Sequence, residues 1–145
     1  MTPEQRHEHY LKIINPRLHE LGAEICNATA IDDEVLHEVA YQKLVSFYGE
    51  QVAMGNWHPS FTESLGDFTH DAAESLVYYR RALDEARRLP DQTHSILICM
   101  AQRLHELGQT EQAEAYLRDG RAEAVRRGDE DCINDADRIS KEIRE

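Results

Sequence analysis

Apolar residues recur every three or four positions along most of this chain, which is the spacing of one face of an α-helix. No stretch shows a convincing alternation of apolar and polar residues, as a half-buried strand would. The pattern is clearest over residues 96–127, where Gly108 separates two apolar stripes. The sequence therefore predicts an all-α protein that contains a helical hairpin in this region.

Capping and breaking residues define the first two helices. Residues 2–5, Thr-Pro-Glu-Gln, form a capping box with proline at the first helical position. Pro16 removes a backbone donor, so we expect it to kink or split the first helix. The second helix begins after Asp32 or Asp33 and ends near Gly55.

Similar signals mark five further helices. Ser60 and Glu63 form a second candidate capping box, and Pro90 ends a helix. Gly108 and Gly128 are typical of helix C-termini. The expected helices cover about residues 59–69, 71–89, 92–107, 110–127 and 129–145.

The third hairpin carries large and small residues in a fixed order, at Leu97, Ala101, Leu104, Gly108, Ala113 and Leu117. This order resembles the tetratricopeptide-repeat family, in which small residues let paired helices approach and large ones fill the groove between them. Gly120 stands where that family prefers alanine.

The second hairpin shows a weaker form of the same pattern. Leu65-Gly66 resembles the leucine-glycine pair of the family's first helix, and Tyr79 with Ala82 resembles the aromatic and the alanine of its second. The resemblance implies a single domain built as a right-handed stack of antiparallel helical hairpins. The expected units are a long hairpin at 1–55, hairpins at 56–90 and 91–128, and a capping helix at 129–145.

The acidic balance of the chain limits its partners. With 28 Asp and Glu against 16 Lys and Arg, the formal net charge is −12. Such a surface repels nucleic acids and acidic membranes and favours a basic protein or peptide. The alternative is that the acidity serves solubility alone.

Segment composition suggests a soluble, cytoplasmic protein. The N-terminus lacks the basic start and apolar stretch of a signal peptide, and the longest apolar run, residues 96–101, is far too short to span a membrane. Cys26, Cys99 and Cys132 have no CxxC spacing and lie within apolar helical patterns. We expect them to be buried, reduced thiols.

No catalytic signature is present. The sequence contains no Walker loop, GxGxxG, GxSxG or HExxH motif, and Cys99 lies between two apolar residues rather than in the polar setting of a nucleophile. We therefore expect neither an enzyme nor a cofactor. Four ring-bearing residues, Trp57, His58, Phe61 and Phe68, are expected to hold the 55–60 loop against the first hairpin. The alternative is that they form an aromatic hot spot for a partner at the mouth of the second hairpin.

The resemblance also implies a binding site. In tetratricopeptide arrays the first helix of each hairpin lines a groove that holds a peptide, and the matching register here gives Glu63, Asp67, His70, Gln102, His105 and Glu106. This polar, acidic lining suits a segment containing Lys or Arg. The predicted function is thus a non-catalytic protein-interaction module, either an adaptor or an antagonist of the bacterial immunity type. The alternative for these six residues is an ordinary solvated helix face.

A second functional hypothesis comes from a carboxylate-x-x-His spacing that occurs four times, at Glu4/His7, Glu34/His37, Asp67/His70 and Asp91/His94. Residues three apart share a helix face, and such pairs on two helices form half of a di-iron bundle site. The alternative function is therefore a helical-bundle metal-binding enzyme that uses His7 and His37 with neighbouring carboxylates. Helical geometry disfavours it, because Glu34 points almost opposite to the apolar stripe of its helix.

Overall fold

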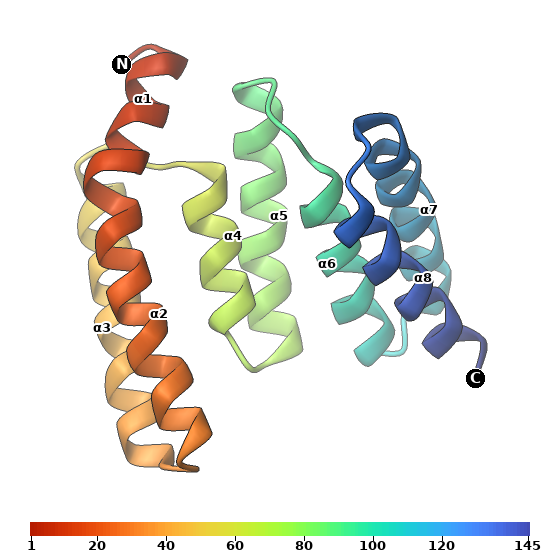
Figure 1. The fold of residues 1–145 in the computed structure, drawn as a ribbon, viewed down its shortest axis with the longest axis horizontal. Helices are drawn as coiled ribbons and strands as arrows, with labels where there is room; N and C mark the ends of the chain where they lie inside the picture. The colour runs from red at the N-terminus through yellow and green to blue at the C-terminus, as the bar shows by residue number, and fades with distance from the viewer.

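The computed structural model describes residues 1–145, and all of its regular structure is helical. Figure 1 shows the elements, which are α1 (Pro3–His9), η1 (Tyr10–Ile14), α2 (Asn15–Ala30), α3 (Glu34–Ala53), α4 (Pro59–Phe68), α5 (Ala72–Arg88), α6 (His94–Glu106), α7 (Thr110–Arg127) and α8 (Glu130–Arg144). The expectation of an all-α protein is confirmed. No helix combines the length and the apolar character that a membrane crossing requires.

The first helix is interrupted where Pro16 was expected to disturb it. Residues Tyr10–Ile14 form a π-helical turn, in which the backbone N–H of Asn15 bonds to the carbonyl of Tyr10. Pro16 follows at the start of α2, where its missing donor would otherwise break the α-helical ladder. The wider turn lets α1, η1 and α2 continue as one long rod (Figure 1).

Most predicted caps are present. Thr2 and Gln5 form both bonds of the capping box, and the Asp33 carboxylate accepts from the backbone N–H of Leu36 at 3.0 Å. The predicted capping box at Ser60 is wrong. Because Pro59 occupies the first helical position, the cap of α4 is His58, whose Nδ1 accepts from the Ser60 N–H at 3.1 Å.

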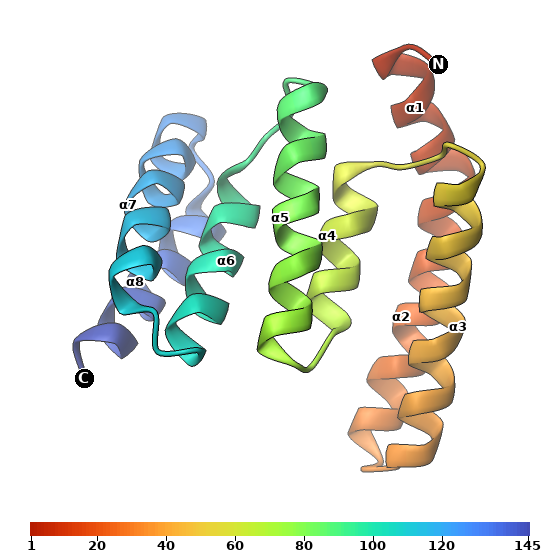
Figure 2. The same cartoon turned by 180° about the vertical axis from the view of Figure 1, so that it is seen from behind.

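The helices pack in the order in which they occur along the chain. α2 packs against α3, α4 against α5, and α6 against α7, and α8 covers both α6 and α7. In Figure 1, α2, α4, α6 and α8 lie on the near side, whereas Figure 2 shows α3, α5 and α7 from the other side. One face is therefore built from the first helix of each hairpin.

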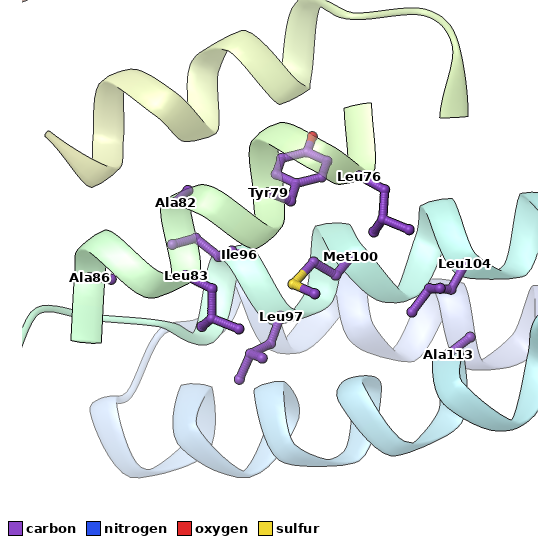
Figure 3. Packing of buried hydrophobic residues seen from close by; sticks show 10 residues of the cluster. All are labelled: Leu76, Tyr79, Ala82, Leu83, Ala86, Ile96, Leu97, Met100, Leu104 and Ala113. Carbon is purple, nitrogen blue, oxygen red and sulfur yellow. The ribbon is translucent and has the colours of Figure 1, made fainter. Parts of the chain in front are cut away.

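Neighbouring hairpins share their apolar cores. Phe61 and Leu65 of α4 are buried together with Leu21 and Leu44 of the first hairpin. A second cluster joins α5, α6 and α7 (Figure 3), and a third joins α6, α7 and α8. Because each hairpin completes the core of the next, no hairpin buries its apolar face alone.

Close helix approach explains Gly120 in the third hairpin. A Cβ added there would lie 2.9 Å from Cγ1 of Ile98 and 3.2 Å from the carbonyl oxygen of His94. Both contacts are tighter than side chains normally tolerate, so α7 meets the start of α6 at a distance that even alanine would disturb.

The cysteine and aromatic expectations have different outcomes. Cys26 is exposed, so the prediction of three buried thiols is wrong; it follows the buried Ile25 by one residue and thus points away from the core stripe. The aromatic prediction is confirmed. Phe61 is buried against Phe47 and Tyr48, and the Arg6 guanidinium covers the Trp57 ring at 3.8 Å.

Candidate binding groove between two hairpins

A cavity of about 260 Å³ lies where α4 meets α6, with a wall from α5. Its lining consists of Asp67, Tyr79, Cys99, Gln102, Arg103 and Glu106. We call it the α4–α6 groove. It brings together three of the six residues predicted to bind a partner, Asp67, Gln102 and Glu106.

Helical spacing explains why α6 supplies most of this lining. Gln102 and Arg103 follow Cys99 by three and four residues and precede Glu106 by four and three, so all four share one stripe of the helix. The opposite stripe of α6, which includes Met100 and Leu104, is buried in the core (Figure 3). The polar stripe is therefore left facing α4.

Tyr79 fixes the orientation of Asp67. The Tyr79 hydroxyl donates to Oδ1 of Asp67 at 2.6 Å, while the rest of the tyrosine is buried. Burial raises the pKa of Tyr79 well above its usual range, so the phenol remains a neutral donor. This bond leaves the second oxygen of the exposed Asp67 carboxylate available to a ligand.

Arg103 is the residue of the groove lining that the sequence did not indicate. Its guanidinium donates to Oε2 of Glu106 at 3.0 Å and to the carbonyl oxygens of Thr69 at 3.0 Å and His70 at 3.5 Å. The last two acceptors follow α4, so Arg103 ties the end of that helix to α6. The Arg103–Glu106 spacing of three was visible in the sequence, but the two carbonyl acceptors were not.

Glu63 lies one turn before Asp67 and is half-buried. Burial, and secondarily the negative charge of Asp67, raises the pKa of Glu63 to about 7. At neutral pH this side chain therefore carries only part of a negative charge. A cation in the neighbouring groove would favour its ionised form.

His70 and His105 do not line the α4–α6 groove. The Nε2 atom of His70 lies 3.0 Å from Nε2 of His37, beside a separate cavity. Nδ1 of His105 is buried without a hydrogen-bond partner. The register that placed all six residues in one lining is thus too simple, because the end of α4 turns His70 toward α3.

The histidines of the rival metal hypothesis lie apart. His7 contacts His58 at the start of α4, with 3.2 Å between Nδ1 and Nε2, whereas His37 contacts His70 beyond its end. A helix of ten residues is about 15 Å long, so the two pairs are too far apart to share one metal ion. The structure thus gives no single centre that includes both His7 and His37.

A third group, His94, Asp129 and Cys132, has potential metal-ligand atoms within 4.8 Å of one another. His94 is buried at the start of α6, and its Nε2 bonds to Oδ2 of Asp129 at 2.8 Å. Asp129 also caps α8 through the backbone N–H of Cys132 at 3.2 Å. The group already has a structural role, because it joins the first turns of α6 and α8.

The α4–α6 groove is lined mainly by polar side chains. It offers carboxylate oxygens, an amide and a guanidinium that already donates to one carboxylate and two backbone carbonyls within the protein. No known protein family, curated protein or solved structure matches this chain. The functional argument is therefore made from the groove itself.

Proposed function

We propose that the chain is a tetratricopeptide-like stack of three hairpins and a capping helix. The successive packing of α2/α3, α4/α5 and α6/α7, closed by α8, supports this assignment. So does the use of small residues where paired helices meet, with Gly66 against Tyr79 and Gly120 against the start of α6. Ser75, at a position where the family usually has alanine, is buried and donates its hydroxyl to the Gly66 carbonyl at 2.7 Å.

We further propose that the protein has a non-catalytic role and binds a basic segment of another protein in the α4–α6 groove. The observation that carries this proposal is the shared cavity of Asp67, Gln102 and Glu106 on the face built from the first helices of the hairpins. The two carboxyl groups of the groove, Asp67 and Glu106, outnumber its one guanidinium, and the partly ionised Glu63 lies one helical turn before Asp67. This excess of negative charge complements Lys or Arg.

The groove suggests how such a segment would be held. A partner ammonium or guanidinium donates to the free oxygen of Asp67 and to Glu106, and the Gln102 amide bonds to the partner backbone. A role as an adaptor or as an immunity-type antagonist follows from which protein supplies the segment. In both roles the contact would be rapid and salt-sensitive, because charge steers the encounter.

The test uses charge reversal and a panel of labelled peptides. Fluorescence anisotropy of the wild type should show binding to Lys- and Arg-containing peptides and none to Glu-containing peptides of equal length. Asp67→Lys/Glu106→Lys should abolish the binding. The matched control is Glu111→Lys/Asp119→Lys, which makes the same charge change at exposed positions on α7 and should retain it. An equal loss of peptide binding in both variants would show that only the net charge of the protein matters, and would reject the groove as the binding site.

A further inference from the structure

Two histidines from different hairpins face each other beyond the C-terminal end of α4. His37 comes from α3 and His70 follows α4, and their Nε2 atoms are 3.0 Å apart with the ring centroids 4.6 Å apart. We propose that this pair, together with a carboxylate of the adjoining cavity, binds a divalent transition-metal ion of the Zn²⁺ type. The site is separate from the α4–α6 groove and does not depend on the function proposed for it.

The spacing of the two nitrogens already matches that of metal ligands. Two imidazole nitrogens bound to one Zn²⁺ at 2.0–2.1 Å are about 3.3 Å apart in tetrahedral geometry and about 2.9 Å apart at right angles. The observed 3.0 Å lies within this range. An ion could therefore replace the shared proton with little movement of either ring.

Carboxylates line the cavity beside the pair, and one of them must rotate toward the histidines to bind the same ion, because no carboxylate oxygen lies within 4.8 Å of both rings' ligand nitrogens. A cavity of about 410 Å³ is lined by both histidines and by Asp32, Asp33, Glu34 and Glu38. Asp33 already caps α3, whereas Glu34 lies one helical turn before His37 and forms no ion pair. We assign Glu34 as the third ligand, and the remaining carboxylates favour a cation over an anion.

The backbone next to His70 is held in place before any ion binds. Thr69 is buried, and its hydroxyl pairs with Tyr41 Oη of α3 at 2.8 Å and donates to the Leu65 carbonyl at 2.6 Å. Arg103 donates to the Thr69 carbonyl from the other side. The position of His70 against α3 is thus fixed by packing, which lowers the entropy cost of binding.

Proton positions separate this pair from the His7–His58 pair. Nδ1 of His58 accepts the Ser60 N–H, so a neutral His58 carries its proton on Nε2, directed at His7. That nitrogen has no lone pair for a metal. Both ring nitrogens of His58 already have a hydrogen-bond partner. The ring is buried and stacks on Tyr10, with 4.2 Å between the ring centroids.

The same argument disfavours the group around His94. Its Nε2 donates to Asp129, so metal binding there would move the proton to Nδ1, which is buried and has no acceptor. His37 and His70 have no such restriction. Neither forms another side-chain hydrogen bond, His70 is exposed, and His37 is half-buried. Both rings can carry their protons on Nδ1 and direct two Nε2 lone pairs at one ion.

The test is isothermal titration of the untagged, chelator-treated protein with ZnCl₂. The wild type should bind one equivalent, and His37→Gln and His70→Gln should each weaken binding about tenfold or more. His7→Gln is the matched control, because it removes one member of the other facing pair, and it should leave the affinity unchanged. Circular dichroism verifies the helicity of each variant. Absence of zinc binding at millimolar concentration, or equal losses in His7→Gln and His70→Gln, would overturn the proposal.

A second measurement locates the ion. Substoichiometric Cu²⁺ should broaden the amide NMR signals around His37 and His70 and spare those around His58 and Asp129. Broadening centred on His94, Asp129 and Cys132 would place the metal elsewhere and reject this site. Asp67→Lys/Glu106→Lys should keep its zinc affinity, so that failure of the groove and failure of the metal site can be told apart.

Discussion

Gly66 lies directly against the ring of Tyr79. A Cβ added to Gly66 would be 2.6 Å from Cε1 and 2.9 Å from Cζ of that ring. Tyr79 cannot withdraw easily, because it is buried and its hydroxyl is bonded to Asp67 (Figure 3 shows its place in the core). The missing side chain at residue 66 therefore sets the distance between α4 and α5.

Gly66→Ala should lower the free energy of unfolding by about 1–3 kcal/mol, since the added methyl group overpacks a rigid contact. Gly49→Ala is the control. Gly49 is also helical, but nothing lies within 4 Å of its added Cβ, so alanine should raise the stability by about 0.5–1 kcal/mol. Urea unfolding followed by circular dichroism measures both. Equal effects of the two substitutions would show that no close contact exists at Gly66.

Asp129→Ala should destabilise the protein more than Asp71→Ala. Both aspartates cap a helix, but only Asp129 also accepts a bond from the buried His94. Loss of the cap alone should cost about 1 kcal/mol in Asp71→Ala. In Asp129→Ala a buried imidazole additionally loses its acceptor. Urea midpoints compare the two variants, and a similar midpoint in both would mean that the His94 contact contributes nothing.

Local signals predicted the helices well because they act within one turn. The expected helix at 110–127 matches α7, and the caps at Thr2, Asp33 and Asp129 depend only on residues three positions away. The failure at Ser60 is also local. Pro59 is a signal for the first position of a helix and Ser60 is a signal for an N-cap. The sequence pattern does not show which of these two adjacent signals sets the start of α4.

The site was predicted only in part, because it depends on contacts between hairpins. The register implied by the tetratricopeptide resemblance put Asp67, Gln102 and Glu106 toward one groove, and all three line the same cavity. The meeting of His37 with His70, 33 positions apart, depends on the angle at which α4 ends against α3, and no local pattern encodes that angle. The sequence did not indicate Arg103 either, because two of its acceptors are backbone carbonyls of the segment after α4, and no sequence pattern marks a backbone acceptor.

Thiol reagents should distinguish Cys26 from the other two cysteines. Cys26 is exposed, whereas burial raises the pKa of Cys99 strongly and that of Cys132 to about 12. Few thiolates then form at the latter sites, so their reaction should be at least about 100-fold slower. When Ellman's reagent is added to the native protein, one equivalent of thionitrobenzoate per chain should be released in a fast phase. Cys26→Ser should remove that phase, and a fast phase that persists would contradict the assignment.

Glu63 makes stability depend on pH. Its pKa is about 7 in the folded protein and 4.5 in the absence of structure, so the folded state binds more protons between these values. Stability should therefore fall as pH rises from about 4.5 through 7 and then level off with respect to this group. Burial of the Glu63 carboxylate is the main cause of its raised pKa, and repulsion from the negative charge of Asp67 raises the pKa further.

Glu63→Gln should remove this component of the pH dependence. The amide remains neutral, so the variant should gain about 1–3 kcal/mol relative to the wild type at pH 8 and little at pH 4. Glu114→Gln, on the exposed side of α7, is the control and should retain the wild-type slope. Urea unfolding at both pH values measures the difference. If Glu63→Gln and the wild type change in parallel between pH 4 and pH 8, Glu63 is solvated in the folded protein and its carboxylate contributes fully to the charge of the groove.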